Sequence, residues 1–322
     1  MTVLDLYKKS NTYKVLKQDF VKDTLSHTYM LKISDEILAK EYAKFFAMQI
    51  YCEDHSLCMN CANCKKVLHD NMGDIKYFPK NNKLSVEESR QIVSESMVMP
   101  YESKKKIFII NNFETATPQS QNALLKVLEE PTASNIFLIV AKSDSTVLKT
   151  ILSRSKKIVE SALDYADVVA YIQENYPDLD IKEIANCAEL ANGNISFAVD
   201  LVSNKVFKML NRDILTVISS LKGSGDVLKM SNILVKYKDN LDEMLDIMLQ
   251  TFLQIKVAIL TKSISARLEG YEDIINSYSP ESISLISKLI IECKNRVKFN
   301  CSYLAIIDYL LFGILEAKFV CK

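Results

Sequence analysis

Glycine and proline are scarce in this chain, with six of each among 322 residues. Because both residues are concentrated in tight turns, their scarcity argues against a turn-rich β architecture and favours long helices. The first glycine of the chain is Gly73. A glycine-rich phosphate loop before that position is therefore excluded.

Net charge and long apolar runs are also missing. Lysine plus arginine equals aspartate plus glutamate at 40 each, so no global field draws the protein to DNA, an acidic ligand or a membrane. The N-terminus carries charges throughout, and the most apolar tail segment is interrupted by Asp308 and Glu316. We expect a soluble, cytoplasmic protein without a membrane partner. Its length fits two or three domains.

The segment CEDHSLCMNCANC contains a cluster of four cysteines: Cys52, Cys58, Cys61 and Cys64. Four thiolates at this spacing suit tetrahedral zinc, and four protein ligands leave no open position for catalysis. The sequence therefore predicts a structural zinc ion. Two alternatives are His55 as a competing ligand and a coincidental group of buried cysteines.

A helix and a strand are predicted between Thr117 and Ala141. Thr117 can cap the helix and Pro118 suits its first turn, while Leu124, Leu125 and Leu128 give it one apolar face. NIFLIVA then has the pattern of a strand buried on both faces. Ser153, Arg154 and Ser155 follow. This order resembles the helix, strand and Ser-Arg-Cys segment of the AAA+ clamp-loader family, with serine in place of the cysteine.

The resemblance implies where a phosphate loop would lie. TYMLKI is predicted as a strand and residues 37–50 as a helix, and SDEILAKE stands between them where ATP-binding relatives carry their glycine loop. Lys40 falls near the position of the phosphate-binding lysine, but Glu41 replaces the hydroxyl residue. Asp35 and Glu36 add negative charge. The alternative for Lys40 is an ordinary solvated lysine.

Two further nucleotide-binding elements of the family are altered. The strand KIFIINN, which follows a helix with a capping box at Ser85 and Glu88, lacks an Asp-Glu pair at its end; Glu114 lies farther along. ANGNISFAV keeps Gly193 but has Ser196 where active relatives place a phosphate-sensing arginine. Joint loss of three elements predicts a degenerate AAA+ domain that does not hydrolyse ATP.

The resemblance implies a function of the delta-prime type within the bacterial DNA polymerase III clamp loader, where the zinc module is also found. Such a subunit acts as a stator while the sliding clamp is loaded on primed DNA. Its Ser153-Arg154 pair faces the ATP site of a neighbouring subunit, and Arg154 is the implied arginine finger in trans. The implied partners are tau/gamma-type ATPase subunits, the delta subunit, the clamp and primer-template DNA. An ordinary salt bridge is the alternative for Arg154.

The expected architecture is an α/β AAA+ core with a parallel sheet between helices (1–161, zinc module at about 52–64), a small helical lid (162–205) and an all-α collar (206–322). Leu310, Leu311, Phe312 and Leu315 in the collar could serve assembly or the collar's own core. Two other functions stay open. One is an active tau/gamma-type ATPase, and the other is a zinc-dependent nucleic-acid-binding protein. The second would need a basic surface, and only a few lysines lie near the cysteines, so its support is weak.

Overall fold

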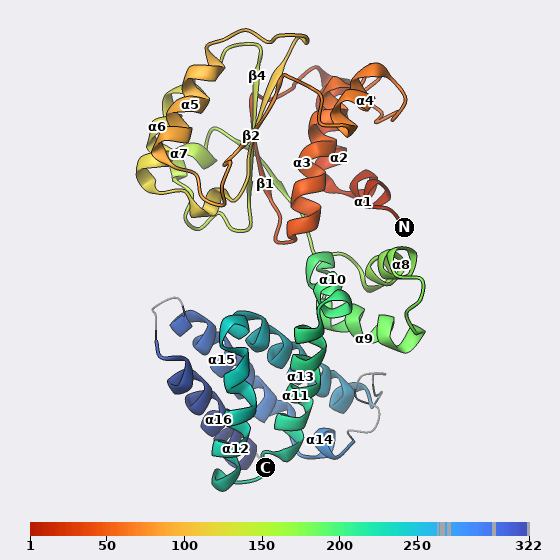
Figure 1. Cartoon of the computed structure of the whole chain (residues 1–322), viewed down its shortest axis with the longest axis vertical. Helices are drawn as coiled ribbons and strands as arrows, with labels where there is room; N and C mark the ends of the chain where they lie inside the picture. Colours follow the sequence, from red (N-terminus) through yellow and green to blue (C-terminus); the bar gives the residue numbers. More distant parts are fainter. Residues whose placement is uncertain (263, 265–267, 269–271, 298–300, 321–322) are drawn as a thin grey trace. The chain divides into compact units, whose positions relative to one another are not determined.

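A computed structural model describes residues 1–262, 264, 268, 272–297 and 301–320. The chain divides into two compact units (Figure 1). The first contains residues 1–174 together with 194–196, and the second contains 175–193 and 197–322.

The first unit is built on a five-stranded sheet in the order β2-β3-β4-β1-β5, and every pair of neighbours is parallel. The strands are β1 (Thr28–Lys32), β2 (Ile75–Phe78), β3 (Lys106–Ile110), β4 (Asn135–Ala141) and β5 (Lys156–Val159). All seven residues of β4 are buried, as expected for a strand with neighbours on both edges and helices on both faces.

Helices cover both faces of this sheet (Figure 1). One face carries α5 (Val86–Ser96), α6 (Pro118–Glu129) and the short α7 (Lys149–Leu152), and the other carries α2 (Asn11–Lys22) and α3 (Glu36–Tyr51). The remaining elements of this unit are α1 (Val3–Lys9), α4 (Ala62–Leu68), the 3-10 turn η1 (Phe113–Thr115) and α8 (Tyr165–Asn175), whose last residue falls in the second unit.

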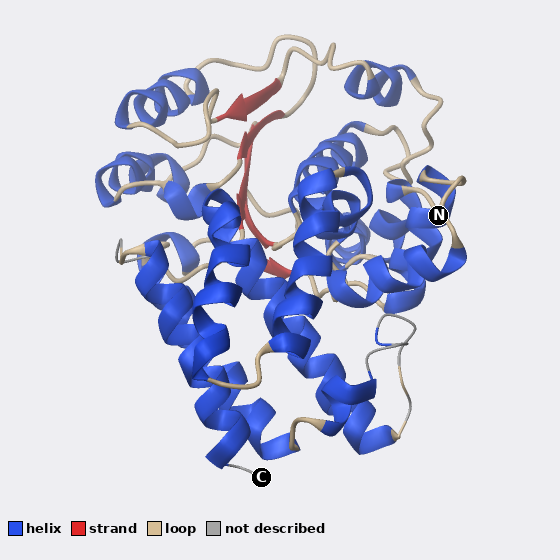
Figure 2. Ribbon diagram, turned by 60° about the horizontal axis from the view of Figure 1, so that its bottom comes forward, coloured by secondary structure: helices blue, strands red, loops and turns tan. Residues whose placement is uncertain are grey.

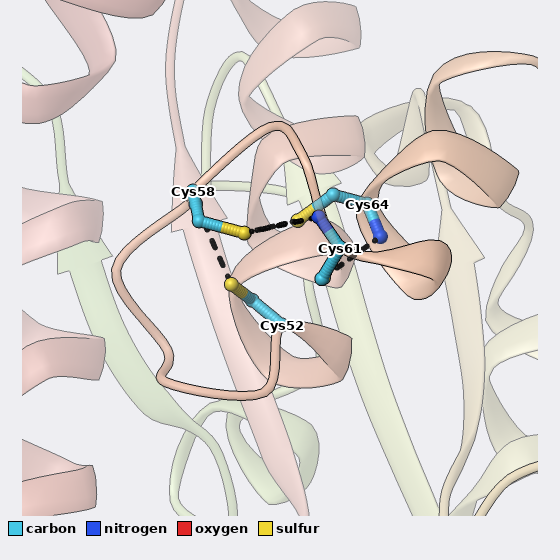
Figure 3. A group of neighbouring side chains, drawn as sticks. All are labelled: Cys52, Cys58, Cys61 and Cys64. Carbon is cyan, nitrogen blue, oxygen red and sulfur yellow. Dashed lines mark hydrogen bonds between the residues drawn. The ribbon is translucent and has the colours of Figure 1, made fainter.

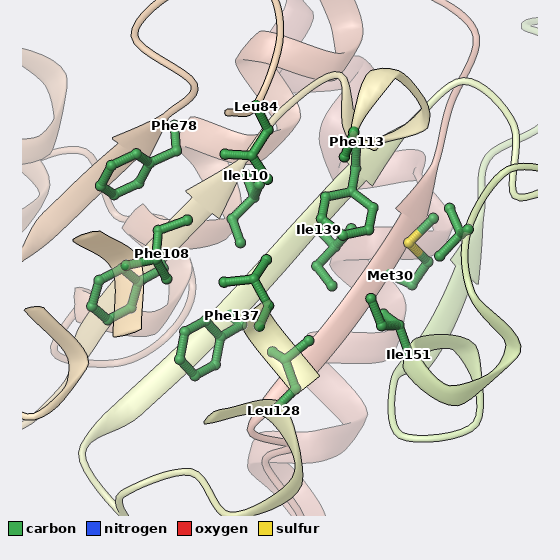
Figure 4. Packing of buried hydrophobic residues seen from close by; sticks show 14 of the residues in the cluster. Met30, Phe78, Leu84, Phe108, Ile110, Phe113, Leu128, Phe137, Ile139 and Ile151 are labelled. Atoms are coloured by element: carbon green, nitrogen blue, oxygen red, sulfur yellow. The ribbon is translucent and has the colours of Figure 1, made fainter. Parts of the chain in front are cut away.

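An apolar core fills the space between the sheet and the first of these helical layers (Figure 4). Phe108 of β3 and Phe137 of β4 stack with ring centroids 5.1 Å apart, and Leu128 of α6 packs in the same cluster. On the opposite face, Tyr29 of β1 meets Phe46 of α3 edge to face at 5.1 Å. These two layers hold the carboxyl ends of the strands in fixed positions, which is where open parallel sheets bind their ligands.

The second unit contains helices and no strand among its described residues (Figure 2). Its elements are α9 (Ile181–Ala191), α10 (Ile195–Ser203, begun in the first unit), α11 (Lys205–Ser220), α12 (Ser224–Leu234), η2 (Val235–Asn240), α13 (Leu241–Thr261), α14 (Glu272–Asn276), α15 (Pro280–Val297) and α16 (Tyr303–Val320). Residues 224–261 are long and apolar enough to cross a membrane, but core helices pass the same test. Leu245, Met248 and Phe252 of α13 are fully buried, so we interpret this segment as part of the core of the second unit.

The fold class predicted from the sequence is confirmed: an α/β core with a parallel sheet between helices is followed by helices alone. The division into three domains stays a prediction. In the tail helix α16, Leu310, Leu311 and Leu315 are buried in the unit's own core, whereas Phe312 is half exposed. Only Phe312 of these four side chains is therefore available for a contact with another molecule.

Candidate functional site

The four clustered cysteines converge on one point of the first unit (Figure 3). Cys52 follows the last turn of α3, Cys58 lies in the loop, and Cys61 and Cys64 lie at the start of α4. Their sulfur atoms all lie within 4.8 Å of one another, and Sγ of Cys58 and Cys64 are 3.9 Å apart. A tetrahedral ion with metal–sulfur distances of about 2.3 Å places its sulfurs about 3.8 Å apart. The quartet therefore fits a metal ion of this kind.

Backbone N–H groups also point at the sulfurs. The N–H of Cys58 donates to Sγ of Cys52 at 3.5 Å, that of Cys61 to Sγ of Cys58 at 3.3 Å, and that of Cys64 to Sγ of Cys61 at 3.4 Å. The N–H groups of Cys61 and Asn60 lower the pKa of Cys58 to about 7. Burial raises the pKa of Cys64 and of Cys52. A bound cation would displace those protons, because metal ligation requires thiolates.

The loop between Cys52 and Cys61 has an unusual backbone. His55, Leu57 and Met59 have φ values of 56°, 60° and 62°, in the left-handed region that non-glycine residues seldom adopt. Each such residue costs on the order of 1–3 kcal/mol and persists only where its surroundings hold it. Ligation of both loop ends by one metal ion would supply that restraint.

The contacts of His55 argue against a role as a metal ligand. Its Nδ1 lies 3.0 Å from the carbonyl oxygen of Gln49, and its ring stacks on Phe20 with centroids 3.6 Å apart. It is not among the metal-binding group of side chains. Of the other cysteines that the structure describes, Cys187 and Cys293 are buried and Cys301 is exposed. Cys321 lies outside the described residues.

A cleft of about 410 Å³ opens at the carboxyl ends of β1, β3 and β4, where a nucleotide would bind in an ATPase of this architecture. The charged side chains that line it are Asp35, Glu36, Lys40, Glu114 and Lys142. Lys142 forms a salt bridge with Glu36, and its backbone N–H donates to Glu114 at 3.2 Å. The lining of the cleft therefore contains three carboxylates and two lysines, and one of these lysines, Lys142, is already paired with Glu36.

The N-terminus of α3, which would face phosphates, is occupied by a side chain. Asp35 is buried at 4% exposure and caps α3 by accepting a hydrogen bond from the N–H of Leu38 at 3.0 Å. Ser196 donates its hydroxyl hydrogen to the same carboxylate at 2.6 Å. Asp35 and Ser196, which belong to two of the three altered nucleotide-binding elements, thus contact each other.

Arg154 lies on the turn between α7 and β5 and is 39% exposed. Its guanidinium makes a 3.0 Å salt bridge with Glu129 at the end of α6 and donates to the carbonyl oxygen of Thr150 at 3.0 Å. Ser153 donates to the same carbonyl at 3.0 Å. Ser155, which replaces the family's cysteine, donates to the carbonyl oxygen of Ile151 at 2.7 Å, so its polar group is satisfied.

Known proteins resemble this chain over the region that contains the sheet, the cysteine quartet and Arg154. Residues 8–163 match the family described as DNA polymerase III, delta subunit. The chain is 26% identical over 199 residues to DNA polymerase III subunit delta' of Bacillus subtilis, covering 60% of this chain and 59% of that protein. The chain is therefore similar to clamp-loader subunits of DNA polymerase III.

Other subunits of DNA polymerase III are similar to the chain as well. The tau/gamma subunit of Haemophilus influenzae is 26% identical over 235 residues, which cover 70% of this chain and 34% of that protein. A solved DNA polymerase III gamma subunit-related protein from Thermotoga maritima is 15% identical, with a TM-score of 0.46 over 95% of this chain and 99% of the other. The chain thus spans between a third and three fifths of the length of these two curated relatives, and both subunit types occur among them.

The spacing of the cysteines predicted the quartet and the clamp-loader resemblance pointed to Arg154, and the structure brings the four cysteines together. It places Arg154 on the unit's surface and pairs it with Glu129, a partner that sequence reasoning missed. The contact between Asp35 and Ser196 was also missed, although both residues had been noted separately. Neither contact has a local sequence signal.

Proposed function

We propose that this chain is a clamp-loader subunit of the delta-prime type, which does not hydrolyse ATP. It acts as a stator and supplies Arg154 as an arginine finger to a neighbouring tau/gamma-type ATPase subunit while the sliding clamp is loaded on primed DNA. The observation that carries this proposal is the Asp35 carboxylate at the N-terminus of α3, where an ATPase of this fold would bind phosphates.

Electrostatics support the loss of nucleotide binding. A helix N-terminus attracts phosphate through unpaired N–H groups and the helix dipole. Here Asp35 already accepts from that N-terminus, and Glu36 and Glu114 line the same cleft. A triphosphate would bring further negative charge against these three carboxylates at short range. Lys40 and Lys142 do not outnumber them.

The surroundings of Arg154 support a role in trans. Its salt bridge with Glu129 joins two half-exposed side chains, and such pairs contribute only about 0–1 kcal/mol. A γ-phosphate presented by a neighbouring subunit could therefore draw the guanidinium away at little cost. The planar group is suited to two phosphate oxygens at once.

We assign the metal of the cysteine quartet as zinc, because four thiolates in tetrahedral reach favour it over harder ions. Its role is structural. Zinc would fix the loop after α3 and the start of α4, while Cys52 and Cys64 exclude water through their burial.

The isolated chain should neither hydrolyse ATP nor bind it with micromolar affinity, because Asp35 occupies the N-terminus of α3 and no glycine loop precedes it. Isothermal titration with MgATP and a phosphate-release assay would measure both properties. Lys40→Ala is the matched variant, since Lys40 lines the cleft. Micromolar binding that Lys40→Ala abolishes would favour the alternative, an active tau/gamma-type ATPase, a subunit type that occurs among the relatives.

Assembly with the other clamp-loader subunits should depend on exposed apolar side chains of the second unit, called the helical unit below. Phe312 on α16 is 52% exposed, so Phe312→Glu should weaken assembly about tenfold or more without unfolding the chain. Analytical size exclusion with the delta and tau/gamma-type subunits would measure it. Val21→Glu on α2, at 81% exposure, is the control in the other unit. Equal affinities of both variants and the wild type would refute a contact at Phe312.

A further inference from the structure

Two helix N-termini meet at one buried carboxylate in the first unit. Oδ1 of Asp35 accepts from the N–H of Leu38 in the first turn of α3. Oδ2 accepts from the N–H groups of Ile195 and Ser196 in the first turn of α10, at 3.2 Å from Ser196. One side chain therefore satisfies N–H groups of two helices, which otherwise have no partner within their own helix.

The hydroxyl of Ser196 completes the arrangement. It donates to Oδ1 of Asp35 at 2.6 Å and accepts from the N–H of Ile37 at 2.8 Å. Gly193 just before α10 has a φ of 82°, a conformation that favours glycine, and lets the chain turn so that the following N–H groups face Asp35. Asp35 and Ser196 thus cap each other's helices.

A free anion at this point would receive the same hydrogen bonds, because convergent helix N-termini form an anion-binding site. We infer that the Asp35 carboxylate is a built-in substitute for such an anion and holds the first turn of α10 on the start of α3 without any ligand. This inference shares the Asp35 carboxylate with the proposed function, but its tests use hydrogen exchange and Tm of the isolated chain, so its failure is distinguishable from a failure of the proposed role in clamp loading.

Asp35→Ala should loosen both helix starts at once. Residue-resolved amide hydrogen exchange in the full chain should be faster by about tenfold or more at Leu38, Ile195 and Ser196, since each loses a charge-assisted hydrogen bond. Glu36→Ala is the control: this neighbouring carboxylate is exposed and pairs with Lys142. It should leave exchange at Ile195 and Ser196 within about twofold of the wild type. Unchanged exchange in Asp35→Ala, or equal effects of both variants, would overturn the inference.

Inorganic pyrophosphate tests whether the Asp35 carboxylate occupies a site that would otherwise bind a free anion. It should slow the exchange of Ile195 and Ser196 in Asp35→Ala and raise the Tm of that variant, while the wild type and Glu36→Ala respond little. An equal response in the wild type would show that Asp35 does not fill the position. No response in Asp35→Ala would show that the helix ends do not form an anion site, and this would also overturn the inference.

Asp35→Ala could also fail to fold. The test then uses Asp35→Asn, which keeps the shape but loses the charge, and Ser196→Ala, which removes the hydroxyl. Because the two side chains contact each other directly, the Tm losses should be clearly less than additive in the double variant. Strict additivity would contradict the mutual capping.

Discussion

Cys61→Ser should reduce bound zinc from one equivalent per chain to a small fraction and unfold the segment from Cys52 to Leu68, while the helical unit remains folded. Zinc in sites of this type contributes on the order of 10–16 kcal/mol of apparent binding free energy. Since the loop holds three left-handed non-glycine residues, it should not keep its conformation once the ion is lost. Metal analysis and limited proteolysis of the freshly purified chain would measure both effects.

The substitution separates ligation from helix capping. Cys61 is also the N-cap of α4 and accepts from the N–H of Cys64, and serine is among the best N-cap residues. Loss of α4 in Cys61→Ser would therefore reflect the missing metal ligand. Cys301→Ser, at an exposed cysteine outside the quartet, is the control. Zinc well below one equivalent in the wild type, with no further loss in Cys61→Ser, would rule out the zinc assignment.

Local signals predicted much of the first unit. The helix expected over 37–50 is α3 (Glu36–Tyr51), and NIFLIVA is β4 from Asn135 to Ala141. Thr117 caps α6 through the N–H of Ser120, and Ser85 with Glu88 forms the expected capping box. Each of these features depends on residues a few positions apart, where periodicity and cap chemistry act directly.

Features that depend on distant pairs could not be predicted in the same way. Ser196 lies 161 positions from Asp35, and Arg154 meets Glu129 only because the sheet brings the end of α6 next to the turn after α7. The edge strand β2 was not predicted, because only its two end residues are buried and no clear alternation appears. In α16, periodicity could not separate Phe312 from its buried neighbours, because the helix is apolar on nearly all sides.

Arg154→Ala should leave the fold, the zinc and complex assembly intact but slow ATP hydrolysis by the neighbouring subunit. A guanidinium against the γ-phosphate stabilises charge that spreads over the phosphoryl oxygens during transfer. Arginine fingers contribute on the order of 10³–10⁵ in turnover at the site they serve. A complex with several ATP sites would show a partial loss overall. Arg154→Lys should also be slow, because an ammonium lacks the planar fork.

Glu129→Gln distinguishes a finger from a structural salt bridge, because it removes the partner and keeps the guanidinium. If Arg154 mattered only through that pair, both variants would lower stability slightly and affect turnover equally. If Arg154 acts in trans, Glu129→Gln should retain most turnover, while Arg154→Ala does not. The measurement is clamp- and DNA-stimulated ATPase of rebuilt complexes, with assembly checked separately by size exclusion. Wild-type turnover and clamp loading in a fully assembled Arg154→Ala complex would reduce Arg154 to a surface residue, because a guanidinium that contacts the transferred phosphate cannot be removed without cost.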